Sequence, residues 1–101
     1  MDKYKIIISG RVYSMLGNHI RFLSQVNINA AERLKKNVME YIYSLEAMPE
    51  RHPFLEDEYI PPEKYRKLLV EKRYLILYQV KGDIVYIDYV IDCRQDYRWL
   101  T

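Results

Sequence analysis

The sequence has few of the residues that build metal centres and nucleotide-binding loops. Cys93 is the only cysteine, which excludes an internal disulfide and any metal site made from paired cysteines. The two histidines, His19 and His52, have no ligand-like spacing to each other or to Cys93. The three glycines are isolated at positions 10, 17 and 82, so there is no glycine-rich phosphate loop. We therefore expect no zinc site, no nucleotide hydrolysis and no cofactor.

Long hydrophobic runs are also missing. Apolar stretches such as residues 6–8 and 74–78 fall far below the roughly 20 residues that a membrane-spanning helix requires. The first residues reach only a short strand-like run and carry no secretory signal pattern. A lone cysteine suits a reducing compartment. These features predict a cytoplasmic protein without a membrane segment.

The composition is that of an ordinary globular protein, with 50% hydrophobic and 30% charged residues. A length of 101 residues predicts a single domain over residues 1–101. The net charge is only +2, but the charges are unevenly distributed. Residues 46–63 contain six acidic residues and one arginine, whereas residues 64–73 contain five basic residues and one glutamate. This asymmetry indicates a local charged surface rather than a uniformly basic protein.

The first half of the chain predicts a strand followed by two helices. Residues 4–8 are β-rich, and Ser9 is placed to cap a following helix. Apolar residues recur at helical spacing over residues 12–23 and again over residues 31–45. Asn29, with Glu32 three residues later, predicts the start of the second helix, and Pro49 predicts its end. Together these residues predict a helical hairpin.

The second half predicts a loop followed by three strands. All four prolines lie within residues 49–63, which we expect to form a long functional loop. Residues 65–70, 74–80 and 84–91 are β-branched and aromatic, and short turns separate them. A short C-terminal element follows at residues 92–101. The order is strand, helix, helix, strand, strand, strand, which makes an α+β fold.

Alternation in the last strand predicts which residues share a face of the sheet. One face would carry Val85, Ile87, Tyr89 and Ile91, and the other Tyr86, Asp88 and Val90. Helices are expected to cover one face only, so the uncovered face is a candidate for function.

The second half of the chain is rich in basic residues and tyrosines. Cations of this kind hold phosphate backbones, and exposed tyrosines stack on unpaired bases. The same residue types also suit ordinary edge strands, and a basic surface can equally bind an acidic protein segment. The residues in question are Lys64, Tyr65, Arg66, Lys67, Lys72, Arg73, Tyr74, Arg94, Tyr97 and Arg98.

Short motifs in this region resemble a known family. A Tyr-basic-X-Leu strand lies at residues 65–68, a tyrosine-bounded strand at 74–80, a Val-Tyr-Ile strand at 85–87, and an Arg-X-Asp element at 94–96. Residues 31–45 with the following 46–49 resemble a helix that ends in Leu-X-X-X-Pro. This combination is similar to the RelE/ParE superfamily of type II toxins. The resemblance implies a four-stranded antiparallel sheet with the helical hairpin on one face, and a cognate antitoxin that wraps over the toxin.

RelE-like members of the superfamily bind the ribosomal A site and cleave mRNA, using the RNA 2′-hydroxyl as the nucleophile. The resemblance then implies catalytic roles for Arg66 and Lys67 as phosphate clamps, and for Arg94 and Tyr97 in steadying the phosphate and handling a proton. The carboxylates of Glu71, Asp92 and Asp96 are weaker candidates, because carboxylates beside cations usually form simple ion pairs. The remaining residues expected to bind RNA are Lys64, Tyr65, Lys72, Arg73 and Arg98.

One position departs from the nuclease pattern. RelE-like nucleases carry an arginine directly after the tyrosine of the third strand, and this chain has Leu75 there. ParE-like members have no nuclease site and inhibit DNA gyrase instead. The sequence therefore leaves three functions open: a ribosome-dependent mRNA endonuclease, which is the favoured interpretation, a gyrase inhibitor, or a toxin homologue without activity.

Overall fold

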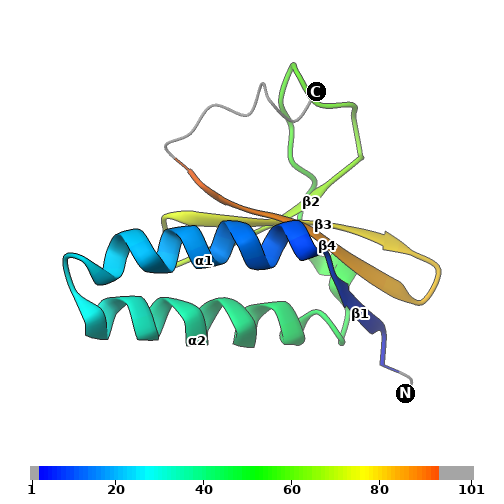
Figure 1. Cartoon of the computed structure of the whole chain (residues 1–101). Coiled ribbons are helices and arrows are strands. Elements are labelled where there is room, and N and C mark those ends of the chain that lie inside the picture. Colours follow the sequence, from blue (N-terminus) through cyan, green and yellow to red (C-terminus); the bar gives the residue numbers. More distant parts are fainter. Residues whose placement is uncertain (1–2, 94–101) are drawn as a thin grey trace.

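The computed structural model describes residues 3–93 and confirms the predicted order of elements. Strand β1 (Lys5–Ile8) leads into helices α1 (Gly10–Ser24) and α2 (Ile28–Ser44). A short 3-10 turn, η1 (Pro49–Arg51), begins the loop, and strands β2 (Arg66–Val70), β3 (Tyr74–Lys81) and β4 (Ile84–Asp92) follow. Both helices lie on one side of the sheet (Figure 1). Within residues 3–93, no helix has the length and apolar character to cross a bilayer.

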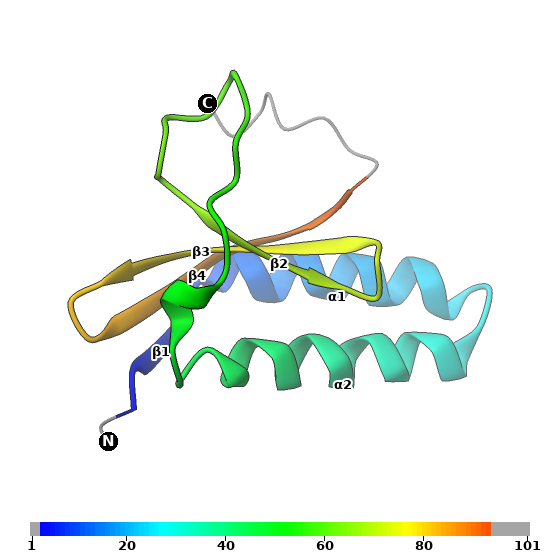
Figure 2. The ribbon, with the colours of Figure 1, turned by 180° about the vertical axis from the view of Figure 1, so that it is seen from behind.

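The sheet is mixed, so the expectation of a wholly antiparallel sheet is wrong. The strand order is β1-β4-β3-β2, and the meander from β2 to β4 is antiparallel, as its short turns require. Strand β1 pairs with β4 in parallel, with Lys5 opposite Ile84 and Ile8 opposite Ile87. Along the chain both helices separate β1 from the meander, so no hairpin turn sets the direction of β1. Figure 2 shows β1 at the far edge of the sheet from β2.

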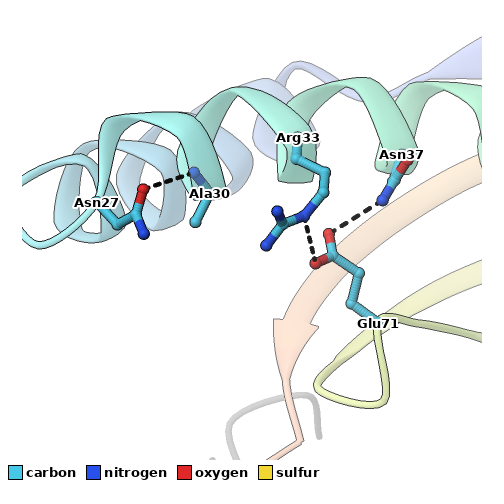
Figure 3. Close-up of polar contacts among 5 residues, drawn as sticks. All are labelled: Asn27, Ala30, Arg33, Asn37 and Glu71. Carbon is cyan, nitrogen blue, oxygen red and sulfur yellow. Dashed lines mark hydrogen bonds and ion pairs between the residues drawn. The ribbon is translucent and has the colours of Figure 1, made fainter.

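The structure confirms the predicted capping residue of the first helix but not that of the second. Ser9 caps α1 as expected, and its Oγ accepts a hydrogen bond from the backbone N–H of Arg11 at 3.2 Å. Helix α2 is capped by Asn27 rather than Asn29, with its Oδ1 accepting from Ala30 N at 3.0 Å (Figure 3). Asn27 takes the extended conformation of a cap, and the short connection from α1 places Asn29 inside the first turn.

The main core lies between the helices and the sheet. Residues of α1 and α2 spaced three or four apart form an apolar stripe that packs on alternate residues of β2, β3 and β4. Burial of these side chains is the main stabilisation of the domain. The fully or almost fully buried members include Val12, Leu16, Leu34, Val38, Ile42, Val70, Ile76, Tyr78, Val85, Ile87 and Val90.

A β-bulge interrupts the alternation of β4. Leu77 pairs with Tyr89, and the next residue, Tyr78, pairs with Ile87, so Asp88 is an extra residue in β4. Val85 and Ile87 therefore face the helices as predicted, but Val90 also does. Tyr89 and Ile91 lie on the opposite face, so the predicted pattern is wrong beyond Asp88.

The loop that follows η1 covers part of the face opposite the helices. It rises from the sheet on the side away from α1 and α2 (Figure 1). Its residues Leu55 and Ile60 pack on the sheet and form a second buried cluster, which we call the loop-side cluster. The sheet face that was expected to be free is therefore covered over its β2 end. The cluster consists of Leu55, Ile60, Tyr65, Leu75, Leu77 and Ile91.

Two glycines offer a paired stability test. A methyl group at Gly17 would meet only Nη2 of Arg21, at 3.9 Å, so Gly17→Ala should raise the free energy of unfolding by up to ~1 kcal/mol. Gly82 has a φ of +62° in the β3–β4 turn, so Gly82→Ala should lower the free energy of unfolding by about 1–2 kcal/mol. Urea denaturation of both variants checks the pair. Shifts of the same sign would contradict the assigned backbone conformations.

Candidate functional surface on the loop side of the sheet

The structure brings only part of the expected site together. Lys64, Tyr65, Arg66 and Lys67 follow one another from the end of the loop into β2, while Lys72 and Arg73 lie at the β2–β3 turn. The other predicted residues, Arg94, Asp96, Tyr97 and Arg98, lie outside the described residues.

Arg66 holds the loop against the sheet. Its Nη1 donates hydrogen bonds to the backbone carbonyl oxygens of Glu50, at 3.0 Å, and His52, at 2.7 Å. Its guanidinium lies 4.0 Å from the centre of the Phe54 ring. Bonds from a charged donor to backbone carbonyls are stronger than neutral ones, and stacking on an aromatic ring adds to them. The side chain that was expected to clamp phosphate is therefore engaged within the protein.

Tyr65 is buried, with an exposed fraction of only 6%. Its ring meets Tyr89 edge to face at 5.8 Å, and Lys64 Nζ lies 5.4 Å from its centre. The guanidinium of Arg11 lies 4.2 Å from the centre of the Tyr89 ring. These four side chains therefore form a linked cluster of two perpendicular rings and two cations. Sequence reasoning missed Arg11, because it belongs to α1 and is far from the other three in the chain.

Lys67 and Leu75 face the same shallow cavity. It has a volume of about 340 Å³, and its other walls are His52, Pro53, Leu68 and Leu69. Leu75 is 8% exposed and belongs to the loop-side cluster. The backbone N–H of Lys67 donates to the carbonyl of Pro53 at 2.9 Å, which ties the loop to β2. The position where nuclease members carry arginine is thus part of an apolar cluster.

The charged residues of the β2–β3 turn form ion pairs. Arg73 Nε lies 3.2 Å from Asp92 Oδ2. Glu71 lies 3.9 Å from Arg33 Nε and accepts a hydrogen bond from Asn37 Nδ2 at 3.4 Å (Figure 3). Glu71 and Asp92 are therefore partners of cations, as was expected for them. The Glu71 contacts also tie the turn to α2.

Three acidic side chains near this surface, two phenols and a thiol, have raised pKa values. Burial raises the pKa of Tyr78 to about 12, and its hydroxyl donates to the carbonyl of Pro49 at 2.6 Å. Burial likewise raises the pKa of the Tyr65 phenol and of the Cys93 thiol. None of these three is a base at neutral pH. No group of three or more histidine, cysteine or acidic residues in positions 3–93 is arranged to hold a metal ion.

His52 makes stability depend on pH. Burial, followed by the charges of Arg51 and Arg66, lowers its pKa below the ordinary value of 6.5, and its buried Nε2 has no hydrogen-bond partner among the described residues. Between that lowered pKa and 6.5 the unfolded chain binds more protons, so stability falls as the pH drops through this window. His52→Gln should remove this part of the pH dependence in urea denaturation series. An identical pH profile for both proteins would contradict the burial of this imidazole.

The comparisons with known proteins agree with the fold. The family model for the ParE toxin of the type II toxin–antitoxin system parDE matches residues 6–97. A solved structure described as the chromosomal ParDE TA system from P. aeruginosa has a TM-score of 0.71 and 14% sequence identity, and the match covers 89% of this chain and 96% of that one. At this identity the likeness establishes a shared fold. A search of curated proteins finds no match. Because the family model matches most of its length, the chain belongs to the ParE toxin family of type II toxin–antitoxin systems.

Proposed function

We propose that this toxin arrests growth by inhibiting DNA gyrase and that it is neutralised by a cognate antitoxin. The family that matches is the ParE toxin, and the resemblance to ParE-like members implies inhibition of gyrase rather than cleavage of RNA. The observation that carries the proposal is the burial of Leu75 in the loop-side cluster. An arginine there would stabilise the transition state of RNA cleavage, and loss of one such group costs on the order of 10²–10³ in rate.

The contacts of the other expected nuclease residues support the same choice. A phosphate clamp needs a cation whose donors face the ligand, whereas Arg66 donates to two loop carbonyls. Base stacking needs an exposed ring, whereas Tyr65 is buried against Tyr89. Lys67 would then be the one cation of β2 left to contact phosphate, because the donors of Arg66 are engaged by the loop.

The alternative is mRNA cleavage by Lys67 with Arg94 and Tyr97. Expression without antitoxin separates the two functions. We expect growth arrest with an accumulation of relaxed plasmid, and no mRNA 5′ ends at codon positions. Codon-positioned cuts in mRNA with normally supercoiled plasmid would overturn the proposal and support the ribosome-dependent nuclease. Absence of any arrest would support a homologue without activity.

The antitoxin is expected to be encoded next to this gene. The loop side offers cations and the loop itself offers carboxylates at Glu56, Asp57, Glu58 and Glu63, so both charge signs are present for a wrapped segment. Co-expression with the neighbouring gene should relieve the arrest and yield a stable complex on size-exclusion chromatography. Unrelieved toxicity would contradict this pairing.

A further inference from the structure

The loop after η1 forms a cavity from its own residues. The cavity has a volume of about 420 Å³, and every residue that lines it lies within positions 54–63. Its apolar walls are Phe54, Leu55, Ile60 and Pro62. The volume falls in the range of about 300–1,000 Å³ that holds small ligands, so the space accepts one large side chain. We call it the loop cavity.

The polar walls of the loop cavity carry charge of one sign. Glu56, Asp57 and Glu63 line it, and none of the described residues that line it is a cation. Asp57 Oδ1 accepts a hydrogen bond from the backbone N–H of Tyr59 at 2.8 Å. The side chains of Glu56 and Glu63 make no hydrogen bond or ion pair with another residue within positions 3–93. An occupant that is both apolar and positively charged is complementary to such walls.

The cations closest to this cavity along the chain have other contacts. Lys64 and Arg66 line a neighbouring cavity together with Glu63, whose charge they partly offset. The guanidinium of Arg66 is also bound to two loop carbonyls. The negative charge of the loop cavity therefore rests mainly on Glu56 and Asp57.

The end of β4 approaches the loop cavity through the loop-side cluster. Leu55 and Ile60 belong to that cluster and also line the cavity. Ile91 is a member of the same cluster, and Cys93 packs against it. The backbone N–H of Cys93 donates to the carbonyl of Arg73 at 2.7 Å, which fixes the path of the chain to this point. The end of β4 and the loop both rise from the sheet face opposite the helices (Figures 1 and 2).

The residues that follow β4 have a composition complementary to the cavity. Positions 94–101 read Arg-Gln-Asp-Tyr-Arg-Trp-Leu-Thr, with two arginines against one aspartate. Trp99 and Leu100 are large and apolar, and Arg98 precedes them directly. The six residues from Cys93 to Trp99 can span about 20 Å when extended, which is enough to cross the loop-side cluster. An arginine can also form paired hydrogen bonds with a carboxylate.

We propose that residues 94–101 dock into the loop cavity of the same chain. Trp99 fills the apolar part, and Arg98 pairs with Glu56 and Asp57. Arg98, which the sequence assigned to RNA, is then engaged within the protein, as Arg66 is. The docking concerns the toxin without its antitoxin and does not depend on gyrase inhibition, so each proposal can fail without the other.

Trp99 is the only tryptophan of the chain, so its fluorescence reports the docking directly. In the folded protein its emission should lie at shorter wavelength than in urea, and acrylamide should quench it weakly. Glu56→Gln/Asp57→Asn removes two charges but keeps an amide oxygen for the Tyr59 N–H. This variant should raise the quenching constant about three- to five-fold at low salt, because surface ion pairs are lost.

Arg98→Ala should raise the quenching constant to a similar extent. Its combination with Glu56→Gln/Asp57→Asn should add little, because both changes remove the same contact. Fully additive effects would overturn the pairing of Arg98 with these carboxylates.

Glu32→Gln/Glu40→Gln is the matched control, since both glutamates are exposed on α2. It removes the same charge and should leave quenching unchanged. Equal effects of the two double variants would overturn the site, as would a Trp99 that is as accessible in the folded protein as in urea. Quenching that weakens as the protein concentration rises would assign the occupant to a second copy of the chain instead. Circular dichroism confirms that each variant is folded.

Discussion

Replacing Leu75 with arginine should lower the free energy of unfolding by roughly 2–4 kcal/mol. The side chain is 8% exposed and packs among Leu77, Ile91 and the loop residue Leu55. The substitution removes a buried apolar side chain. It also places a cation in the loop-side cluster, none of whose members is a carboxylate. Restoring the arginine of the nuclease members should therefore disturb the loop rather than create a nuclease. Urea denaturation monitored by circular dichroism measures the change.

Leu69→Arg is the matched control. Leu69 lies directly opposite Leu75 in the β2–β3 pairing, but it is 47% exposed, so its replacement should change stability by no more than about 0.5 kcal/mol. If Leu75→Arg were as stable as Leu69→Arg, the cavity beside Lys67 would have room for a cation at this position. A stable Leu75→Arg that also cleaved mRNA would contradict the structural role assigned to Leu75.

Arg66→Ala should have the second large effect, a loss of roughly 2–3 kcal/mol in the free energy of unfolding. It removes charge-assisted hydrogen bonds to two loop carbonyls, which are left without this donor, and the stacking on Phe54. Arg66→Lys should restore only part of the loss, because an ammonium group cannot stack as a flat guanidinium does. The loop should become more accessible, which limited proteolysis and amide hydrogen exchange over residues 52–64 would detect.

Lys64→Ala provides the comparison for Arg66. Lys64 is exposed, and its ammonium group lies 5.4 Å from the Tyr65 ring; its hydrogen bond to the carbonyl of Pro61 is made by the backbone, so Lys64→Ala should leave both stability and loop protection nearly unchanged. A stable Arg66→Ala protein with an unchanged loop and lost toxicity would instead show that Arg66 contacts the target directly.

Local patterns in the sequence were sufficient for most of the fold. Helical spacing of apolar residues identified both helices, and the short turns after Val70 and Lys81 fixed the antiparallel meander. These features depend on residues close together in the chain. The direction of β1 could not be predicted in the same way, because its pairing with β4 joins residues about eighty positions apart.

The bulge in β4 is a second feature that local patterns do not show. Residues 84–91 alternate without interruption in the sequence, and only the pairing with β3 shows Asp88 as the extra residue. The shift brings Tyr89 to the loop side, where it joins Arg11 and Tyr65. The cluster of rings and cations on that side is a consequence of the bulge, so it could not be foreseen from strand alternation.

The candidate site was only partly predictable for a related reason. Residue types pointed to the cations and tyrosines in and beside β2 as a candidate site. Their roles depend on the path of the loop, which buries Tyr65 and brings the carbonyls of Glu50 and His52 to Arg66. A long connection without periodicity gives no signal for such contacts.

A supercoiling assay with purified gyrase and relaxed plasmid tests the proposed function most directly. The full-length toxin, freed from its antitoxin, should block supercoiling as its concentration approaches that of gyrase, and addition of the antitoxin should restore it. Complete supercoiling in the presence of excess folded toxin would contradict gyrase inhibition.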